Sequence, residues 1–237
     1  YILYPGLTKF PTILGHEFSG KVAEVGKEVT LLQPGDMVTV EEMIWCGRCV
    51  PCRNGYPNHC TNLEEIGFTI PGAFANFIAV DEKFCWKIDA IAERYGSEDK
   101  AYAMGALTEP SCVAYNAMFT RAGGFKPGHY VNVYGAGPIG LAAIGLAKAA
   151  GAGMIVAFEI SPKRLELAKQ VGADYAYDPR EVDPSEVMME LSGGQGFDFH
   201  FEAAGVPEIA IPQMEKAMAI NSRMVQVGRA AQRVPMY

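Results

Sequence analysis

The apolar and polar positions of the 237-residue chain follow one pattern before about residue 90 and another after about residue 128. The first part holds short β-type runs at 21–25, 36–40 and 73–80, separated by glycine and proline, which predicts a barrel or sandwich. The second part predicts strands at 131–134, 154–158, 197–201 and 224–227 and a short strand near Tyr175, alternating with helices at 139–150, 162–171, 184–191 and 207–219. Such alternation predicts an α/β domain with a parallel sheet covered by helices.

A mostly helical composition fills residues 90–121, between the two patterns, and we place a domain boundary there. The predicted domains are residues 1–115 and 116–237. The chain begins with Tyr1, residues 1–12 lack the features of a secretory signal, and the last predicted strand is the fifth of a sheet that usually has six. We therefore expect segments of both domains to be missing, at the N-terminus of the first and the C-terminus of the second.

Charge and composition argue against some classes of partner and indicate where the protein is located. The net charge is −7 and no basic cluster is present, which argues against nucleic acid or an anionic membrane surface as partners. The uncharged run 131–147 is interrupted by glycines and Pro138, so it predicts a strand, a turn and a helix rather than a membrane span. Cys85 and Cys112 stand alone among apolar residues, which favours a cytoplasmic location.

Four further cysteines form the strongest motif of the chain. They follow a Cys-x2-Cys-x2-Cys-x7-Cys spacing, with glycine and proline between them. This pattern predicts a closed structural zinc site, because zinc prefers four soft ligands in a tetrahedron. Two disulfides, or unrelated buried thiols, are the alternative interpretation, and His59 is a possible competing ligand. The predicted ligands are Cys46, Cys49, Cys52 and Cys60.

A Gly-x-Gly-x-x-Gly motif directly follows the predicted strand 131–134 and opens the next helix. The glycines allow a tight turn and a close approach to a pyrophosphate, which the helix N-terminus attracts. Glu159 ends the next strand, where a carboxylate would bind the ribose hydroxyls and repel a 2′-phosphate, so NAD is favoured over NADP. Lys163 keeps NADP as a minor alternative. The predicted cofactor-binding residues are Gly135, Gly137, Pro138, Ile139, Gly140, Glu159 and Arg164.

A Gly-His-Glu motif at 15–17 continues with glycines at 20 and 26 and Val29. Alone, His16 would more often be a structural histidine and Glu17 a surface charge. Together with the cysteine and glycine motifs, it makes the chain resemble the zinc-containing medium-chain dehydrogenase/reductase family of the alcohol dehydrogenase superfamily. The resemblance covers essentially the whole chain and implies a GroES-like β-barrel catalytic domain with a structural zinc lobe, followed by a Rossmann NAD-binding domain.

The resemblance also implies a catalytic zinc site. His16 would bind the zinc, with Glu17 behind it or alternating as a ligand. Glu109, in a Thr-Glu-Pro-Ser sequence similar to the polyol branch of the family, would bind directly or through water; it could instead be a helix N-terminal charge, and Cys112 is a poorer substitute. The family's first ligand is a cysteine upstream of the Gly-His-Glu motif. No cysteine precedes Cys46, so we expect this chain alone to lack a complete catalytic zinc site and to be inactive.

The implied activity is zinc-dependent hydride transfer between NAD and a secondary alcohol, a polyol or cyclic polyol. The opening residues 2–6 and the segment 91–100 are similar to bacterial inosose dehydrogenases. Threonine or butanediol dehydrogenases of the same branch are the alternative enzymes, and a non-catalytic zinc- and nucleotide-binding protein is an alternative of another class. The resemblance implies a homodimer or homotetramer.

Overall fold

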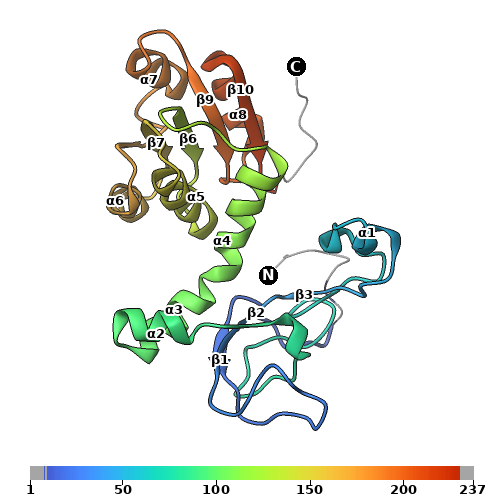
Figure 1. Cartoon of the computed structure of the whole chain (residues 1–237). Helices are drawn as coiled ribbons and strands as arrows, with labels where there is room; N and C mark the ends of the chain where they lie inside the picture. Colours follow the sequence, from blue (N-terminus) through green and yellow to red (C-terminus); the bar gives the residue numbers. More distant parts are fainter. Residues whose placement is uncertain (1–7, 9, 230–237) are drawn as a thin grey trace. The chain divides into compact units, whose positions relative to one another are not determined.

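The computed structural model describes residue 8 and residues 10–229, and it divides the chain into two compact units, residues 1–109 and 110–237 (Figure 1). The division falls inside helix α4 (Thr108–Tyr115), and the predicted boundary at residue 115 is the last residue of that helix. Each unit has its own buried core.

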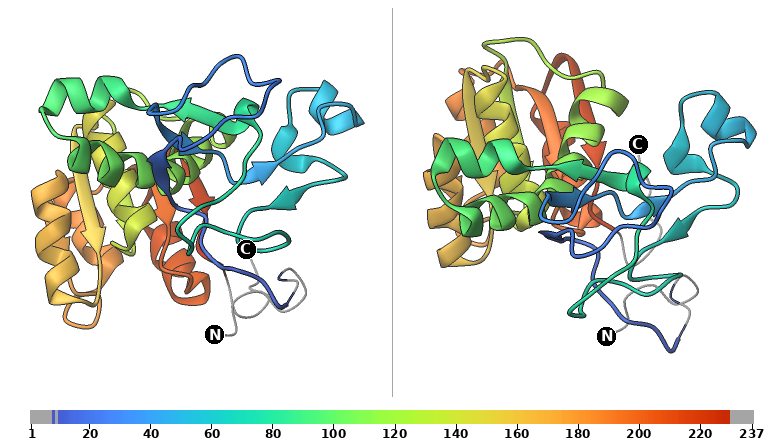
Figure 2. Two further views of the ribbon diagram at one scale, coloured as in Figure 1. Left: turned by 90° about the horizontal axis from the view of Figure 1, so that it is seen from below. Right: turned by 60° about the horizontal axis from the view of Figure 1, so that its bottom comes forward.

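The first unit is built on a three-stranded antiparallel sheet in the order β1-β2-β5. Gly20 pairs with Val38, and Val38 pairs with Lys87. A two-stranded ladder of β3 and β4 leads into and out of a lobe that holds α1 and the 3-10 turn η1; Figure 2 shows this lobe in cyan as an extension of the unit. The elements are β1 (Ser19–Lys21), β2 (Met37–Val40), β3 (Met43–Ile44), α1 (Val50–Arg53), η1 (Pro57–His59), β4 (Glu64–Glu65), η2 (Glu82–Phe84), β5 (Cys85–Lys87), α2 (Asp89–Tyr95) and α3 (Glu98–Ala106).

Two of the strands expected in this unit differ in the structure. The run 21–25 contributes only Lys21 to a strand, and the run 73–80 forms no strand. In that run Phe74 and Phe77 are each 80% exposed, so they do not form the buried side of a pleated strand. The backbone of residues 72–74 instead donates hydrogen bonds to carbonyls of residues 13–15. The prediction for 73–80 was wrong because apolar alternation makes a strand only where a partner strand is available.

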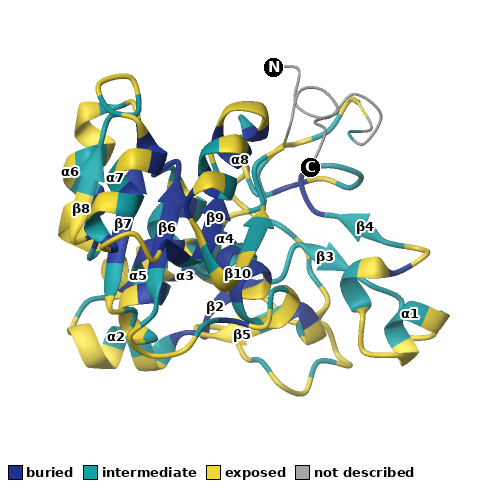
Figure 3. Ribbon diagram, turned by 90° about the horizontal axis from the view of Figure 1, so that it is seen from above, coloured by how far each residue is buried: buried dark blue, intermediate teal, exposed yellow. Residues whose placement is uncertain are grey.

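The second unit is a parallel five-stranded sheet in the order β10-β9-β6-β7-β8, covered by helices on both faces. One face packs against α4 and α5 and the other against α7 and α8. Figure 3 shows the central strands buried between helices whose outer sides are exposed. The elements are η3, a π-helical turn (Asn116–Arg121), β6 (Tyr130–Tyr134), α5 (Pro138–Ala149), β7 (Met154–Phe158), α6 (Pro162–Val171), β8 (Tyr175–Tyr177), α7 (Pro184–Leu191), β9 (Phe197–Glu202), α8 (Pro207–Lys216) and β10 (Met218–Gln226).

The strand order reverses beside β6. The chain runs from β6 outward through β7 to β8, then returns to β9 on the other side of β6. In open α/β sheets, ligands bind outside the carboxyl ends of the strands at such a switch point. The glycine motif follows β6 directly, so the fold puts it at this position. The predicted α/β fold with a dinucleotide-type sheet is confirmed.

Within the described residues, no helix combines the length and the apolar character needed to cross a membrane.

Candidate zinc and nucleotide sites

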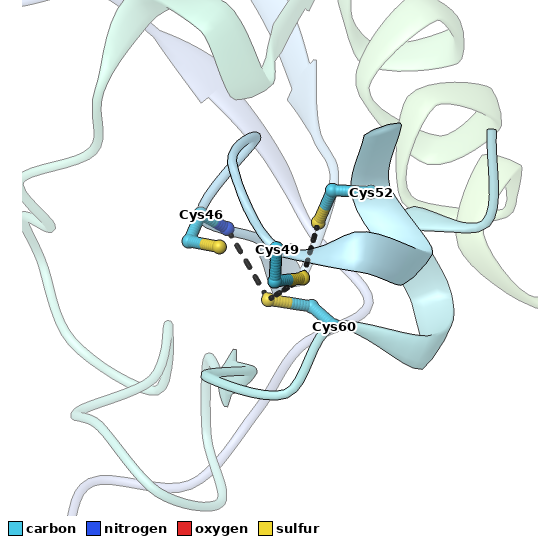
Figure 4. A group of neighbouring side chains, drawn as sticks. All are labelled: Cys46, Cys49, Cys52 and Cys60. Carbon is cyan, nitrogen blue, oxygen red and sulfur yellow. Dashed lines mark hydrogen bonds between the residues drawn. The ribbon is translucent and has the colours of Figure 1, made fainter. Parts of the chain in front are cut away.

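The four motif cysteines converge in the lobe of the first unit (Figure 4). Cys49 is the N-cap of α1, Cys52 lies within α1, and Cys60 follows η1. All four sulfur atoms lie within 4.8 Å of one another. His59 is adjacent in sequence but is not part of this group within the described residues.

The spacing of the sulfur atoms fits a tetrahedral zinc ion. The Sγ atoms of Cys49 and Cys60 are 3.8 Å apart, and those of Cys49 and Cys52 are 3.3 Å apart. A tetrahedron with zinc–sulfur bonds of about 2.3 Å has edges of about 3.8 Å, whereas a disulfide needs a sulfur separation of about 2.05 Å. All four cysteines are free thiols, so the geometry agrees with metal ligands and not with the disulfide alternative.

Backbone amides stabilise thiolates in the lobe. Hydrogen bonds from the Arg48 and Cys49 backbone lower the pKa of Cys46 to about 6, and the Cys52 and Thr61 backbone lowers the pKa of Cys49. Desolvation and neighbouring thiols raise the pKa of Cys52 to about 12. Thiols this close cannot all ionise without a cation between them, and a bound Zn²⁺ would remove that conflict.

A second group of possible ligands consists of His16, Glu17 and Glu109, whose ligand atoms also lie within 4.8 Å of one another. His16 and Glu17 come from the loop before β1, and Glu109 lies in the first turn of α4. The ring of Phe68 contacts the ring of His16, with centroids 4.8 Å apart. The structure therefore brings together three residues that are 93 positions apart at most, all of which belong to the first unit.

Close backbone packing holds the loop that carries His16. A Cβ on Gly72 would lie 2.3 Å from the Gly15 carbonyl oxygen, and one on Gly67 would lie 2.7 Å from it. Gly15 has a φ of +100°, which favours glycine. The amide of Ala73 donates to the Gly15 carbonyl at 2.9 Å. Three glycines thus let two loops touch directly beside His16.

The electrostatics of this group favour a cation. Burial, and then the negative charges of Glu42 and Glu17, raise the pKa of Glu109 to about 7. A divalent ion among these carboxylates would offset the repulsion, and imidazole with carboxylate oxygens is a donor set that zinc accepts. Glu42 had not been expected here, because its position after a strand carries no ligand spacing that the sequence would reveal.

The glycine motif takes the geometry that a bound pyrophosphate needs. Gly135 has a φ of +85°, and a Cβ on Gly140 would lie 1.8 Å from the Gly135 carbonyl oxygen. Gly137 is the N-cap of α5, and among the described residues no atom outside its own turn lies within 4 Å of where its Cβ would be. Pro138 is the first residue of α5, and Ile139 packs against the core. The turn is therefore tight at two glycines and open at the third, in front of a helix N-terminus.

Glu159 connects this turn to the end of β7. Its carboxylate accepts hydrogen bonds from the amides of Ala136 at 2.8 Å, Ile160 at 2.9 Å and Ser161 at 2.9 Å. Arg164 lies 3.9 Å from the same carboxylate. A carboxylate has about four acceptor positions, so three amide bonds leave room for one further donor at the edge of the glycine turn.

Comparisons with known proteins identify a family for each part of the chain. Residues 2–90 match the alcohol dehydrogenase GroES-like domain, and residues 138–237 match the zinc-binding dehydrogenase family. The scyllo-inosose 3-dehydrogenase of Thermotoga maritima is 44% identical over 100% of this chain, which spans 62% of that relative's length. The L-threonine 3-dehydrogenase of Thermococcus kodakarensis is 37% identical over 93% of this chain and 59% of its own length.

Solved structures show the same relationship. A candidate alcohol dehydrogenase from Thermotoga maritima has a TM-score of 0.95 and 44% identity, covering 100% of this chain and 62% of its own. A candidate zinc-binding dehydrogenase from Sinorhizobium meliloti, bound to NADP, has a TM-score of 0.86 and 30% identity over 98% of this chain and 66% of its own. With both domain types matched in their order along the sequence, the chain belongs to the zinc-binding dehydrogenases of the alcohol dehydrogenase family.

Proposed function

We propose that the complete protein is a zinc-dependent oxidoreductase that transfers hydride between NAD and a secondary alcohol, most specifically a polyol or cyclic polyol. The observation that carries this proposal is the convergence of His16, Glu17 and Glu109 within 4.8 Å in the first unit. The glycine turn at the switch point of the second unit supplies a fitting place for the nucleotide.

When bound, zinc would act as a Lewis acid toward the alcohol oxygen and NAD would accept the hydride. The residues of this chain hold and orient these groups. His16, kept in place by Phe68 and by the glycine contacts of its loop, would bind the catalytic zinc with Glu17 and Glu109. The amides at the start of α5 would bind the pyrophosphate. The four cysteines would hold a structural zinc that shapes the lobe.

The cofactor preference rests on Glu159. Its carboxylate keeps a negative charge at the edge of the glycine turn and retains an acceptor position for a ribose hydroxyl. The same charge would repel a 2′-phosphate, although Arg164 lies near enough to reduce the repulsion. We therefore propose NAD as the preferred cofactor. Replacing Glu159 by serine should weaken NAD binding more than NADP binding, and an unchanged preference would contradict this assignment.

The proposed substrate class follows from Glu109 and from the relatives. The curated relative with 44% identity is named for a cyclic polyol derivative, and relatives at 36% to 38% are named for L-threonine. A threonine or butanediol dehydrogenase is therefore the alternative enzyme. A non-catalytic member of the family is the alternative from another class, and retention of His16, Glu17 and Glu109 together argues against it.

The deciding experiment combines metal analysis with turnover in the complete protein. We expect two zinc ions per chain, and NAD-dependent oxidation that is faster with inositols or sorbitol than with butanediol or threonine. His16→Ala should lose one zinc and the activity. Cys49→Ser should lose the other zinc, with activity falling only as the fold is weakened. Unchanged zinc content in His16→Ala, or turnover without zinc, would contradict the proposal.

Two further proposals concern the oligomeric state and the location of the complete protein. We propose a homodimer or homotetramer, which light scattering of the purified protein would test. We propose a cytoplasmic location, because Cys85 and Cys112 stand alone in the sequence among apolar residues. Localisation of a tagged protein outside the cytoplasm would contradict it.

A further inference from the structure

Glu202 is the last residue of β9, and none of its surface is exposed. Its Oε1 atom accepts hydrogen bonds from the amide of Gly205 at 2.8 Å and from the amide of Val206 at 3.3 Å. Val206 is the N-cap of α8. The carboxylate of Glu202 therefore closes the turn 203–206, which leads from β9 into that helix.

The second oxygen of this carboxylate is buried without a hydrogen bond. Among the described residues, Glu202 Oε2 has no hydrogen-bond partner. A Cβ on Gly228 would lie 2.4 Å from this oxygen and 2.3 Å from the Gly205 amide nitrogen, so the backbone that follows β10 packs against it. Burial raises the pKa of Glu202, and amides of the turn 203–206 oppose this effect. The carboxylate is thus enclosed between that turn and Gly228.

The turn 203–206 lies against the glycine turn that follows β6. The amide of Ala203 donates to the Tyr134 carbonyl oxygen at 2.8 Å. A Cβ on Gly135 would lie 2.7 Å from the Ala204 amide nitrogen, so the two turns are in direct backbone contact. Strands β6 and β9 are neighbours, and ligands of such sheets bind outside the carboxyl ends of the strands where the order reverses. Any shift of the turn 203–206 would therefore reach the glycine turn.

Asp198 lies on the same strand and provides a comparison. Its carboxylate accepts a hydrogen bond from the amide of Tyr130 at 2.8 Å, which joins the amino-terminal ends of β9 and β6. This side chain is 28% exposed, so water still solvates it. Glu202 fixes backbone amides at the other end of β9, but at full burial and with one oxygen unpaired. Burying a carboxylate so completely is costly, which indicates that the place of the turn 203–206 matters for more than stability.

We propose that Glu202 is a positioning residue of the nucleotide site, whose carboxylate holds the turn 203–206 against the glycine turn so that the start of α5 is correctly placed for a dinucleotide. It acts through the turn and does not touch the nucleotide. This assignment rests on the proposed function, because it needs NAD at the glycine turn. It adds to that site a residue that lies outside the glycine motif.

The test titrates the complete zinc-loaded protein with NAD in a calorimeter, below the melting transition of every variant. Glu202→Ala removes the acceptor of two amides and should weaken NAD binding at least roughly tenfold, the factor for one hydrogen bond to a charged group. Glu202→Gln keeps an acceptor oxygen and replaces an atom that makes no hydrogen bond, so its affinity should stay within about threefold of wild type. Glu202→Asp keeps the charge but shortens the side chain, so it should weaken NAD binding as the alanine variant does.

Asp198→Ala is the matched control, because it removes a carboxylate that binds a backbone amide at the other end of the same strand. It should lower the melting temperature and leave NAD affinity unchanged. Hydrogen exchange without nucleotide gives a second readout. Exchange should become faster at residues 135–137 and 203–206 in Glu202→Ala, and should keep its wild-type rate there in Asp198→Ala.

The outcomes separate this assignment from the proposed function. If wild type binds NAD but oxidises no alcohol, the proposed function fails while the role of Glu202 is still decided by calorimetry. If Glu202→Ala and Asp198→Ala lose NAD affinity equally, or neither loses it, the assignment is wrong. If Glu202→Ala does not fold, the assignment requires Glu202→Gln to bind NAD more tightly than Glu202→Asp, and the reverse order would overturn it. A wild type that binds no NAD would overturn both.

Discussion

His200 makes the stability of the second unit depend on pH, and this dependence can be measured directly. It lies on β9 with none of its surface exposed. Its Nε2 atom is 3.2 Å from the Phe197 carbonyl oxygen, and its Nδ1 atom is 3.4 Å from Asn132 Nδ2. Because the Asn132 amide nitrogen can only donate, Nδ1 accepts and Nε2 carries the proton, which is the neutral imidazole. The folded unit therefore holds His200 uncharged.

The size of this effect follows from the difference between the pKa of His200 in the folded unit and in the unfolded chain. Burial lowers the pKa of His200 to about 4 in the folded unit, against about 6.5 in an unfolded chain. Between these values the unfolded chain binds a proton that the folded chain does not, so stability is full above pH 6.5 and is lost as the pH falls toward 4. Integrated from pH 6.5 to 4.5, the loss is about 2 kcal/mol, and the whole difference is about 3 kcal/mol.

Two measurements check this prediction. An NMR titration of the Cε1 protons of the four histidines, with the His200 signal assigned from its loss in His200→Gln, should show no titration of that signal above pH 5. Hydrogen exchange of amides in β6 and β9 measures the free energy of unfolding of this unit. When the pH is lowered from 6.5 to 4.5, this free energy should decrease by about 2 kcal/mol less in His200→Gln than in wild type. A midpoint near 6.5 for the His200 signal, or equal losses in both proteins, would refute the reasoning.

Three further predictions concern the lobe and the glycine turn. Removing zinc with a chelator should loosen the cysteine lobe while the second unit stays folded, seen as faster hydrogen exchange confined to residues 43–65; protection unchanged there would contradict a structural metal. Gly140→Ala should destabilise the second unit by about 1–3 kcal/mol in urea unfolding, because the added Cβ would meet the Gly135 carbonyl oxygen. Gly137→Ala should leave stability unchanged, since the space around it is open, but should weaken NAD binding in a titration; equal stability losses in both glycine variants would contradict this distinction.

Helix starts in the second unit could be predicted from single residues. Each of α5, α6, α7 and α8 begins with a proline, whose missing N–H costs nothing in the first turn. Strand β7, between α5 and α6, is a continuous apolar run, which is typical of a strand in a sheet covered on both faces. Strand β7, helix α6 and helix α7 therefore have the predicted bounds.

The bounds of the last helix and the last strand could not be predicted from local sequence. Helix α8 stops at Lys216, three residues before the prediction, and β10 begins at Met218, six residues before it. Asn221 has a φ of +65°, and the pairing of β10 with β9 shifts register between Met218 and Arg223. The irregular strand start depends on its partner β9, so the sequence around residues 218–223 could not reveal it.

The candidate zinc site was predictable as a set of residues but not as an electrostatic environment. His16, Glu17 and Glu109 belong to recognisable motifs, and the structure brings them together. Glu42 belongs to no motif, and the fold places its charge where it raises the pKa of Glu109. Charge acts through space rather than along the sequence, so such a residue is found only from coordinates.

The glycines also show what the sequence alone cannot reveal, because some are required by close packing while another leaves open space. At Gly72 and Gly140 a side chain would collide with backbone oxygen, at 2.3 Å and 1.8 Å, so the protein itself fills the space that glycine leaves. At Gly137 the corresponding space is open, beside a helix N-terminus whose amides have no carbonyl partner. A glycine that packing does not require, at a place that attracts anions, has its explanation in a ligand. Of the three motif glycines, Gly137 is therefore the one whose substitution should separate binding from folding.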